Sequence, residues 1–269
     1  MFIASTGSWI LGASQGAGHA LLLLLRTFLR FPSLWFRRGS IFTQMFLAGV
    51  MSVPVVILVA LFSGWIVALQ TGVELRNYGA HQQIGTLVTG FMVRGWGPVM
   101  TAFILAGRVG SAMAAELGTM RVSEEVDALE VMGIDPLSYL VFPRFVSLAL
   151  MGPILTIYAT VIGVASGALV AIYQLEVPWG VYLQHARAAV EQKDVIAALV
   201  KASTYGVVVS IVGCSQGLRA VHGAEDVGRA PRNSVVVSFV MILILEYLIS
   251  WAFYGTPANT GDGMSSKVG

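Results

Sequence analysis

The acidic residues of this chain are concentrated in one stretch, residues 105–144, which reads LAGRVGSAMAAELGTMRVSEEVDALEVMGIDPLSYLVFPR. Of the 14 acidic residues in the chain, this stretch holds Glu116, Glu124, Glu125, Asp127, Glu130 and Asp135. Apolar runs long enough to cross a bilayer flank this stretch on both sides. A short polar segment between membrane spans is where a membrane protein can contact a soluble partner. We therefore interpret this stretch as a candidate docking segment. From the pattern alone, the alternative is an ordinary solvated helix in a loop.

Three further charged residues stand inside apolar runs: Arg94, Lys201 and Glu246. An unpaired charge within a bilayer costs several kcal/mol, so such residues are expected to face the bundle interior and to pair there. At about 1.5 Å of rise per residue, the three lie at overlapping depths from the predicted outer ends of their spans. They can therefore form one cluster. The alternative is that Lys201 extends outward to water and Glu246 pairs for structure alone.

Enzymatic chemistry finds little support in the sequence. No G-x-x-x-x-G-K-[ST] loop occurs, so the chain is not expected to bind ATP or Mg²⁺ itself. The four histidines show no metal-ligand spacing, and no serine has a partnered histidine. The net charge of +2 is too small to suggest nucleic acid as a partner. We expect no metal, no cofactor and no catalytic residues in this chain.

The composition indicates an integral membrane protein. Hydrophobic residues make up 56% of the chain and charged residues 11%, whereas a soluble domain carries about 25% charged residues. At roughly 20 to 25 residues per span plus loops, about five spans fit in 269 residues. We predict an all-α polytopic fold in which residues 1–269 form a single domain. The predicted spans cover residues 44–69, 84–106, 145–173, 195–218 and 234–254.

The regions outside the spans are also assigned by pattern. Residues 1–40 carry arginines but no acid, which predicts an amphipathic helix at the cytoplasmic headgroups. Residues 70–83 are predicted to form an outer loop, and residues 107–144 a cytoplasmic region. The second span is interrupted by Gly95 and Pro98. With the N terminus inside, ten Lys and Arg residues fall on inner segments and four on outer ones, which favours this orientation.

Within the acidic stretch the sequence predicts a short helix. Ser123 is placed to cap its start, and Gly133 supplies the stop. Val126, Leu129 and Met132 recur at every third position and predict one apolar stripe beside an acidic face. A helix this short is marginal alone and needs something to pack against.

The stretch closely resembles the signature of the MlaE-type permeases. These are membrane subunits of ABC transporters that work with MCE-domain proteins in lipid trafficking, and they include a chloroplast counterpart. The resemblance is dense over residues 94–170 and looser through the last span. In that family the segment is a cytoplasmic coupling helix seated in a groove of the ATPase. The positions carried over by the resemblance are Glu124, Glu125, Asp127, Leu129, Glu130, Met132 and Gly133.

The resemblance also implies an assembly and a location. It implies two copies of this chain around a central cavity, two ATPase subunits that bind ATP and Mg²⁺, an MCE ring outside, and phospholipid or a related lipid as substrate. It implies the inner membrane of a bacterium. Spans 1, 2 and 5 would line the cavity, and helical spacing on span 1 selects Val55, Leu58, Val59 and Phe62 as lining residues.

One departure from the family pattern concerns the charged cluster. The family typically has Arg-Glu-x-Gly-Pro in span 2, whereas this chain has Gly95 after Arg94. Without that acid, Arg94, Lys201 and Glu246 sum to +1 when all are ionised. Our hypothesis is that this excess suits an anionic lipid headgroup.

Another class of transporter is also considered. An ion-coupled secondary transporter would use Glu246 as a proton carrier and span 2 as a broken helix. Such proteins are built from inverted repeats, and the two halves of this chain show no internal similarity.

Overall fold

The computed structural model describes residues 38–221 and 223–255, and its elements over these ranges are helical. Five segments are long and apolar enough to cross a membrane. They are Gly39–Asn77, His81–Val122, Leu137–Leu175, Gln192–Leu218 and Ala224–Gly255. The predicted all-α fold with about five spans is confirmed. The interfacial helix predicted for residues 1–40 lies outside the described residues, apart from the first residues of α2.

The first span is longer than predicted. It consists of α2 (Arg38–Ala48), a 3₁₀ turn at Val50–Ser52, and α3 (Val53–Asn77). The outer loop predicted for residues 70–83 is therefore wrong over most of its length. Polar residues at the end of α3 continue the helix, because a 25-residue helix is about 38 Å long and reaches beyond a hydrocarbon core of about 30 Å.

The second span is continuous, although the sequence suggested an interruption. It runs through α4 (Ile84–Phe91), α5 (Gly97–Leu105) and α6 (Ser111–Val122). Two π-helical turns, Met92–Trp96 and Ala106–Gly110, join these parts. Pro98 falls in the first turn of α5, where its missing N–H is tolerated. The helix also continues well past residue 106, so much of the predicted cytoplasmic region is an extension of span 2.

Five further helices and two π-turns follow α6 in the described part of the chain. They are α7 (Glu125–Val131), a π-turn at Leu137–Val141, α8 (Phe142–Leu175), α9 (Trp179–Ala188), α10 (Gln192–Leu218), α11 (Ala224–Ser250) and a last π-turn at Trp251–Gly255. Helix α11 begins ten residues before the predicted start of span 5 at residue 234, so the polar residues just before that span are helical.

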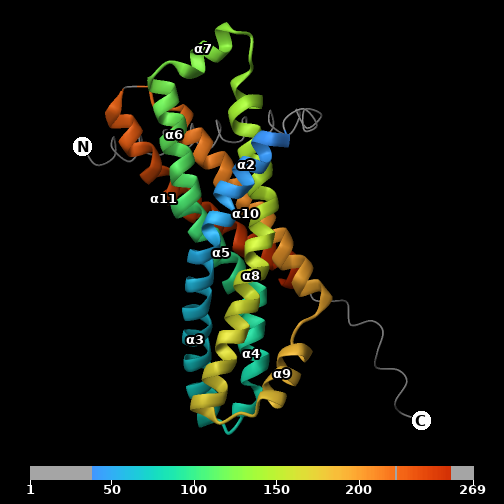
Figure 1. The fold of residues 1–269 in the computed structure, drawn as a ribbon. Helices are drawn as coiled ribbons and strands as arrows, with labels where there is room; N and C mark the ends of the chain where they lie inside the picture. The colour runs from blue at the N-terminus through green and yellow to red at the C-terminus, as the bar shows by residue number, and fades with distance from the viewer. Residues whose placement is uncertain (1–37, 222, 256–269) are drawn as a thin grey trace.

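The two ends of the helix bundle are formed by different elements (Figure 1). Helix α7 stands at one end, and α9 and the turn between α3 and α4 stand at the other. Helices α8 and α10 are central, since α8 packs on α3 and α10, and α10 packs on α6 and α11. At the far end, the buried Tyr182 of α9 donates to the Val164 carbonyl at 2.9 Å. Burial raises the pKa of Tyr182 far above its usual range, so the hydroxyl stays protonated as a donor.

Glycines allow the central helices to touch at their backbones. A Cβ added to Gly206 on α10 would lie 2.2 Å from the carbonyl oxygen of Leu148 on α8. One added to Gly64 on α3 would lie 2.1 Å from the carbonyl oxygen of Gly163 on α8. Gly163 and Gly167 of α8 form a small-residue pair that faces both α3 and span 2. Close backbone approach of this kind is the usual basis of helix association in membranes.

Gly206→Val is expected to destabilise the bundle, because backbone atoms cannot move aside as a side chain can. Overpacking of this kind costs about 1–3 kcal/mol or more, which lowers the thermal unfolding midpoint in detergent. Gly90→Ala is the matched control: no atom lies within 4 Å of its added Cβ, and alanine favours the helix. A Gly206→Val protein that unfolds at the wild-type temperature contradicts this account of the α8–α10 contact.

Candidate functional site

The charged residues of the spans form one hydrogen-bonded network, centred on the fully buried Lys201 of α10. Its ammonium donates to Glu246 Oε1 at 2.6 Å and to Ser250 Oγ at 2.7 Å, both on α11. It also donates to the backbone carbonyl of Arg94 at 2.7 Å. Three acceptors use all three donors of the ammonium. Lys201 therefore pairs inside the bundle and does not extend toward water.

The contact with the Arg94 carbonyl has a cause in the sequence. In an α-helix this carbonyl would accept from the N–H of residue 98, but Pro98 has none. The ammonium of Lys201 supplies a donor in its place. Tyr205, one turn further along α10, donates to Glu246 Oε2. The network thus joins spans 2, 4 and 5.

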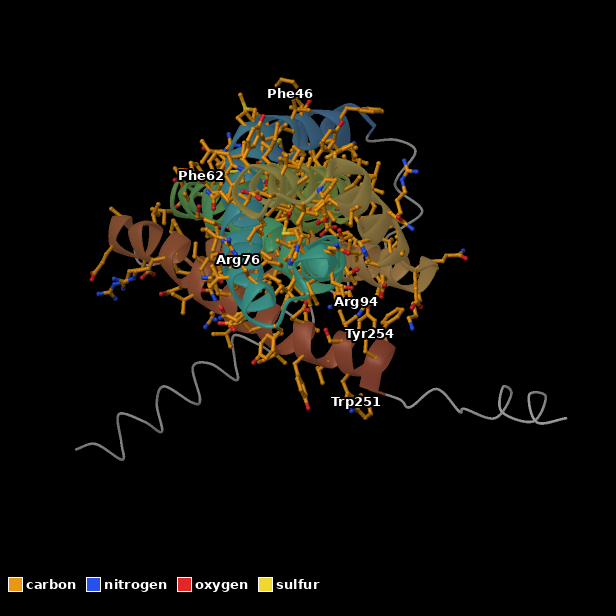
Figure 2. All side chains as sticks on the ribbon, turned by 90° about the horizontal axis from the view of Figure 1, so that it is seen from below. Phe46, Phe62, Arg76, Arg94, Trp251 and Tyr254 are labelled. Atoms are coloured by element: carbon orange, nitrogen blue, oxygen red, sulfur yellow. The ribbon has the colours of Figure 1, made fainter. Side chains whose placement is uncertain are left out.

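The side chain of Arg94 points to a different partner. Its Nη2 lies 3.1 Å from Asp194 Oδ2, at the start of α10. Tyr254 donates to the other oxygen, Asp194 Oδ1, at 2.9 Å, and the Arg94 guanidinium carbon lies 5.8 Å from the centre of the Tyr254 ring. Figure 2 shows Arg94 and Tyr254 side by side at this end of α11. The structure brings together Arg94, Lys201 and Glu246, and it adds Asp194, Tyr205, Ser250 and Tyr254.

These four additions follow a spacing visible in the sequence. Tyr205 lies four residues after Lys201, and Asp194 lies seven before it, so all three share one face of α10. Ser250 and Tyr254 lie four and eight residues after Glu246. Searching each helix at these spacings for further polar side chains would have found them.

Asp194 removes the excess charge that the sequence suggested. Arg94 and Lys201 are balanced by Asp194 and Glu246, so the four side chains sum to zero when ionised. The hypothesis of a surplus positive charge is therefore wrong. What distinguishes Arg94 is exposure: its side chain is 48% exposed, whereas that of Asp194 is 1% exposed.

The predicted helix in the acidic stretch is present as α7, but Ser123 does not cap it. Ser123 donates to the Thr119 carbonyl and ends α6. Glu124 precedes α7 with a positive φ of 61°, so the chain turns sharply between the two helices. Gly133 has a φ of 75° and ends the segment as predicted, with its N–H bonded to the Glu130 carbonyl.

The apolar stripe of α7 is shorter than predicted. Val126 is buried and Leu129 packs beside it, against a cluster that includes Leu117 and Phe142. Met132 is 64% exposed and Val131 is 89% exposed. The helix ends at Val131, so Met132 leaves the face that Val126 and Leu129 share. An apolar tip therefore stands beside acidic side chains at the end of the bundle.

The acids of this segment divide into paired and unpaired groups. Asp127 pairs with Arg121 of α6, and Glu125 accepts from Ser123 at 3.1 Å. Glu116 pairs at 2.9 Å with the buried Arg144 of α8. Glu124 and Glu130 make no ion pair or side-chain hydrogen bond with a described residue, and both are exposed. The charges of these two carboxylates are therefore accessible to a binding partner.

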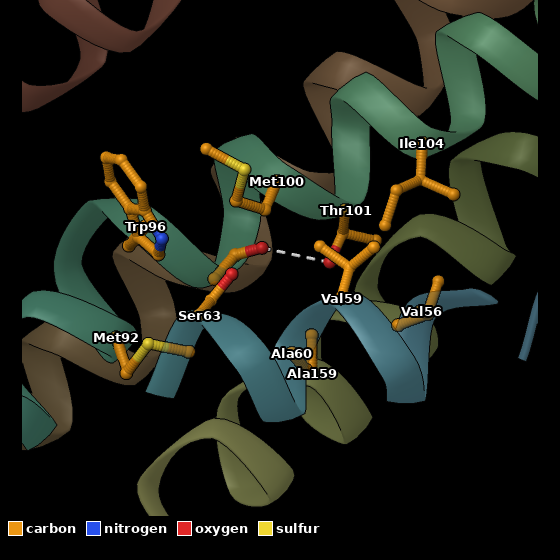
Figure 3. Close-up of a pocket in the computed structure, with 11 residues that line it drawn as sticks. Val56, Val59, Ala60, Ser63, Met92, Trp96, Met100, Thr101, Ile104 and Ala159 are labelled. Carbon is orange, nitrogen blue, oxygen red and sulfur yellow. Dashed lines mark hydrogen bonds between the residues drawn. The ribbon is translucent and has the colours of Figure 1, made fainter. Parts of the chain in front are cut away.

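The residues predicted to line a cavity lie along α3. Val55, Leu58 and Phe62 are exposed on one face of this helix. Val59 lines a small pocket with Ser63 and residues of span 2, including Trp96 (Figure 3). In one chain these side chains form an apolar face rather than an enclosed cavity.

Comparison with known proteins assigns the family. The family described as Permease MlaE matches residues 41–252, which include Lys201 with its three partners, and α7. The chain belongs to the MlaE permease family. A probable ABC transporter permease of Rickettsia conorii is 40% identical over 214 residues, covering 80% of this chain and 83% of its own. One from Synechocystis is 34% identical over 265 residues, covering 93% of this chain and 100% of its own.

A plant protein is also similar. The chloroplastic protein TRIGALACTOSYLDIACYLGLYCEROL 1 of Arabidopsis thaliana is 35% identical over 222 residues, covering 82% of this chain and 62% of its own. As an MlaE-type permease, the chain is a multi-pass membrane protein. Where the family pattern has an acid after Arg94, a Cβ added to Gly95 would lie 3.4 Å from Glu246 Oε1. The Glu246 carboxylate thus lies beside the position that lacks the acid.

Lys201→Met is expected to destabilise the protein by about 3–5 kcal/mol, because it leaves a carboxylate and a backbone carbonyl without their cation. Lys201→Met combined with Glu246→Gln should recover part of this loss, since no unpaired charge then remains. Thermal unfolding in detergent measures both.

Lys193→Met is the control for the removal of a lysine. Lys193 forms an exposed pair with Glu191, and such pairs contribute at most about 1 kcal/mol. If Lys201→Met changed stability as little as Lys193→Met, the network would not hold spans 2, 4 and 5 together.

Proposed function

We propose that this MlaE-type permease is the membrane-spanning subunit of an ABC transporter that moves phospholipid or a related lipid. A separate ATPase subunit would bind ATP and Mg²⁺ and power the movement, and an MCE-domain protein would exchange lipid on the other side of the inner membrane. The observation that carries the proposal is α7, an acidic segment with an exposed apolar tip, anchored at one end of a bundle of the MlaE family. The name of the Arabidopsis relative refers to a galactolipid, which supports a lipid substrate.

The route from the ATPase to the spans begins at α7. Helix α7 packs through Val126 and Leu129 on the ends of α6 and α8. A displacement of α7 by the ATPase would therefore move both of these helices. Helix α6 is tied to α8 by Arg144 and Glu116. Arg108, in the π-turn before α6, donates to Ser52 Oγ at 3.0 Å and to the Met51 carbonyl. These contacts connect α7 to the 3₁₀ turn between α2 and α3. This turn is next to the face of α3 that is proposed to line the cavity.

The proposal uses two copies of the chain. The exposed apolar faces of α3 and α11 would then enclose a lipid between them. The N terminus and α7 would face the cytoplasm. The continuous helix of span 2 removes the broken helix on which the ion-coupled alternative depended.

Glu130→Lys with Met132→Asp is expected to disrupt the contact with the ATPase while the chain still folds, since both side chains are exposed. Interface anchors of this kind contribute at least about 1–2 kcal/mol each, so copurification of the ATPase should fall about tenfold or more. The tagged permease is purified from native membranes, and the associated subunit is identified by its P-loop and by ATP hydrolysis.

Glu74→Lys makes the same charge change at the opposite end of the bundle and should leave copurification unchanged. Loss of the ATPase in both variants, or in neither, contradicts α7 as the coupling helix.

Leu58→Cys in a Cys214→Ala background is expected to react with a membrane-impermeant thiol reagent, because a transport cavity admits water. Leu150→Cys on α8 is similarly exposed in one chain but is expected to face lipid tails and to react slowly. Equal labelling of the two variants in membranes would remove α3 from the cavity wall.

A further inference from the structure

The exposed apolar face of α3 continues beyond the part that is proposed to line the cavity. Its members recur at every third or fourth residue, as one face of a helix does. They are Val55, Leu58, Phe62, Ile66, Leu69 and Val73, and each is exposed. The next residue at this spacing is Arg76, in the last turn of α3. The face therefore leads from the proposed cavity to a positive charge at the outer end of the bundle, opposite α7 (Figure 1).

A groove lies at this outer end, between the last turns of α3 and α8. Its apolar lining consists of Leu69, Val73 and Leu175, and its polar lining consists of Arg76, Asn77 and Gln174. The two helices are in close contact here, since a Cβ added to Gly72 would lie 2.3 Å from Leu175 Cδ1. The groove thus has an apolar part and a polar part, as a site for an amphipathic ligand requires.

The polar side chains of the groove have unused hydrogen-bonding capacity. Arg76 carries five N–H groups, and Asn77 and Gln174 each carry an amide. All three are exposed, and none makes an ion pair or side-chain hydrogen bond with a residue of 38–221 or 223–255. Glu74 and Glu176, the nearest acids in the sequence, do not line the groove. The polar part is therefore suited to an anion that accepts hydrogen bonds.

The groove lies at the depth of lipid headgroups. Arg76 is 23 residues after Val53, the first residue of α3, and this length of helix spans about 35 Å, whereas a hydrocarbon core is about 30 Å thick. Tyr78, Tyr173 and Trp179 are exposed around the same end of the bundle. Exposed Tyr and Trp at the ends of spans are typical of the headgroup region. A membrane lipid therefore reaches this groove at its normal depth.

We infer that this groove binds a phospholipid, with the phosphate on Arg76 and the upper part of an acyl chain against Leu69 and Val73. A guanidinium can bind two phosphate oxygens at once, which a single amide cannot do. Asn77 and Gln174 supply further donors beside it.

The groove is separate from the charged network of spans 2, 4 and 5. Figure 2, seen from the outer end, shows Arg76 and Arg94 at different places in the bundle. The apolar face of α3 joins the groove to the proposed cavity. The inference rests on the proposed lipid transport, and it adds a second lipid site, on the path between the cavity and the outer side.

The test locates a lipid by photolabelling. Full-length protein with its copurified ATPase is placed in nanodiscs of a galactolipid that lacks phosphate. A small fraction of the lipid is phosphatidylglycerol with a diazirine in the upper part of an acyl chain. Labelling of residues 69–77 is measured by mass spectrometry relative to residues 154–161, on an exposed part of α8. The ratio should exceed that of a galactolipid probe with the same chains about tenfold, the factor expected for a hydrogen bond to a charged group.

Arg76→Gln should remove this preference, so that the phosphatidylglycerol and galactolipid probes label residues 69–77 equally. Arg187→Gln is the matched control, because Arg187 is an exposed arginine of α9 at the same end of the bundle but does not line the groove. It should keep the preference. ATP-dependent transfer of the probe from native membranes to acceptor vesicles should also fall in Arg76→Gln and not in Arg187→Gln.

Other occupants of the groove are tested in native membranes. Val73→Cys in the Cys214→Ala background carries a thiol-linked benzophenone and should form an adduct with lipid on irradiation. An adduct with a second protein, or with a second copy of this chain, overturns the inference. Loss of the photolabelling preference on addition of inorganic phosphate assigns the polar part of the groove to free phosphate and overturns it also.

The inference is equally wrong if wild-type protein shows no preference for phosphatidylglycerol, if Arg76→Gln retains the preference, or if lipid transfer is unchanged in that variant. Copurification of the ATPase is scored in the same preparations. If the ATPase is retained while the preference is absent, the groove site fails and the proposed transporter stands.

Discussion

A buried ammonium requires acceptors, and this requirement shapes the centre of the bundle. Lys201 has no access to water, so an unpaired charge there would cost several kcal/mol. Its three acceptors come from spans 2 and 5, which fixes the rotation of both helices relative to α10. Such a network specifies one arrangement more strictly than apolar packing does, because every member must be satisfied.

Glycine contacts and the charged network act in different parts of the structure. Around α8, backbone atoms approach closely at Gly152, Gly163 and Gly206, which makes α3, α8 and α10 a tight unit. Helix α11 has no such contact along its outer half and is held there by polar atoms. A bundle with one firmly packed part and one polar attachment is suited to a transporter, since one element can move while the rest stays folded.

A continuous helix joins the two functional regions. Span 2 carries Arg94 within its first half and leads through α6 to α7. Its two π-turns each contain an arginine, and each arginine bonds to a different helix. π-turns are frequent at functional sites because they present side chains and carbonyls that a regular helix would not. A displacement at α7 therefore reaches other spans through defined contacts.

The sequence by itself determined the class of the protein. Its apolar content and spacing required five spans, and the residues from Arg94 through the acidic stretch were enough to indicate the MlaE-type permeases. Gly133 was identified as the end of the short helix, since a turn with positive φ favours glycine. These features are local: composition, span length and turn chemistry act within a few residues.

Only the tertiary structure decided which charges meet. The seven-residue spacing places Asp194 on the same face of α10 as Lys201, but nothing in the sequence indicated that it pairs with Arg94, one hundred residues away. The sequence suggested a break in span 2 at Pro98. In the structure, Lys201 of another helix supplies the hydrogen-bond donor that the proline lacks. Ser123 was a good cap by type, but the chain turned at Glu124 instead. Partners of this kind are set by how helices rotate and cross, and that geometry results from packing along the whole chain.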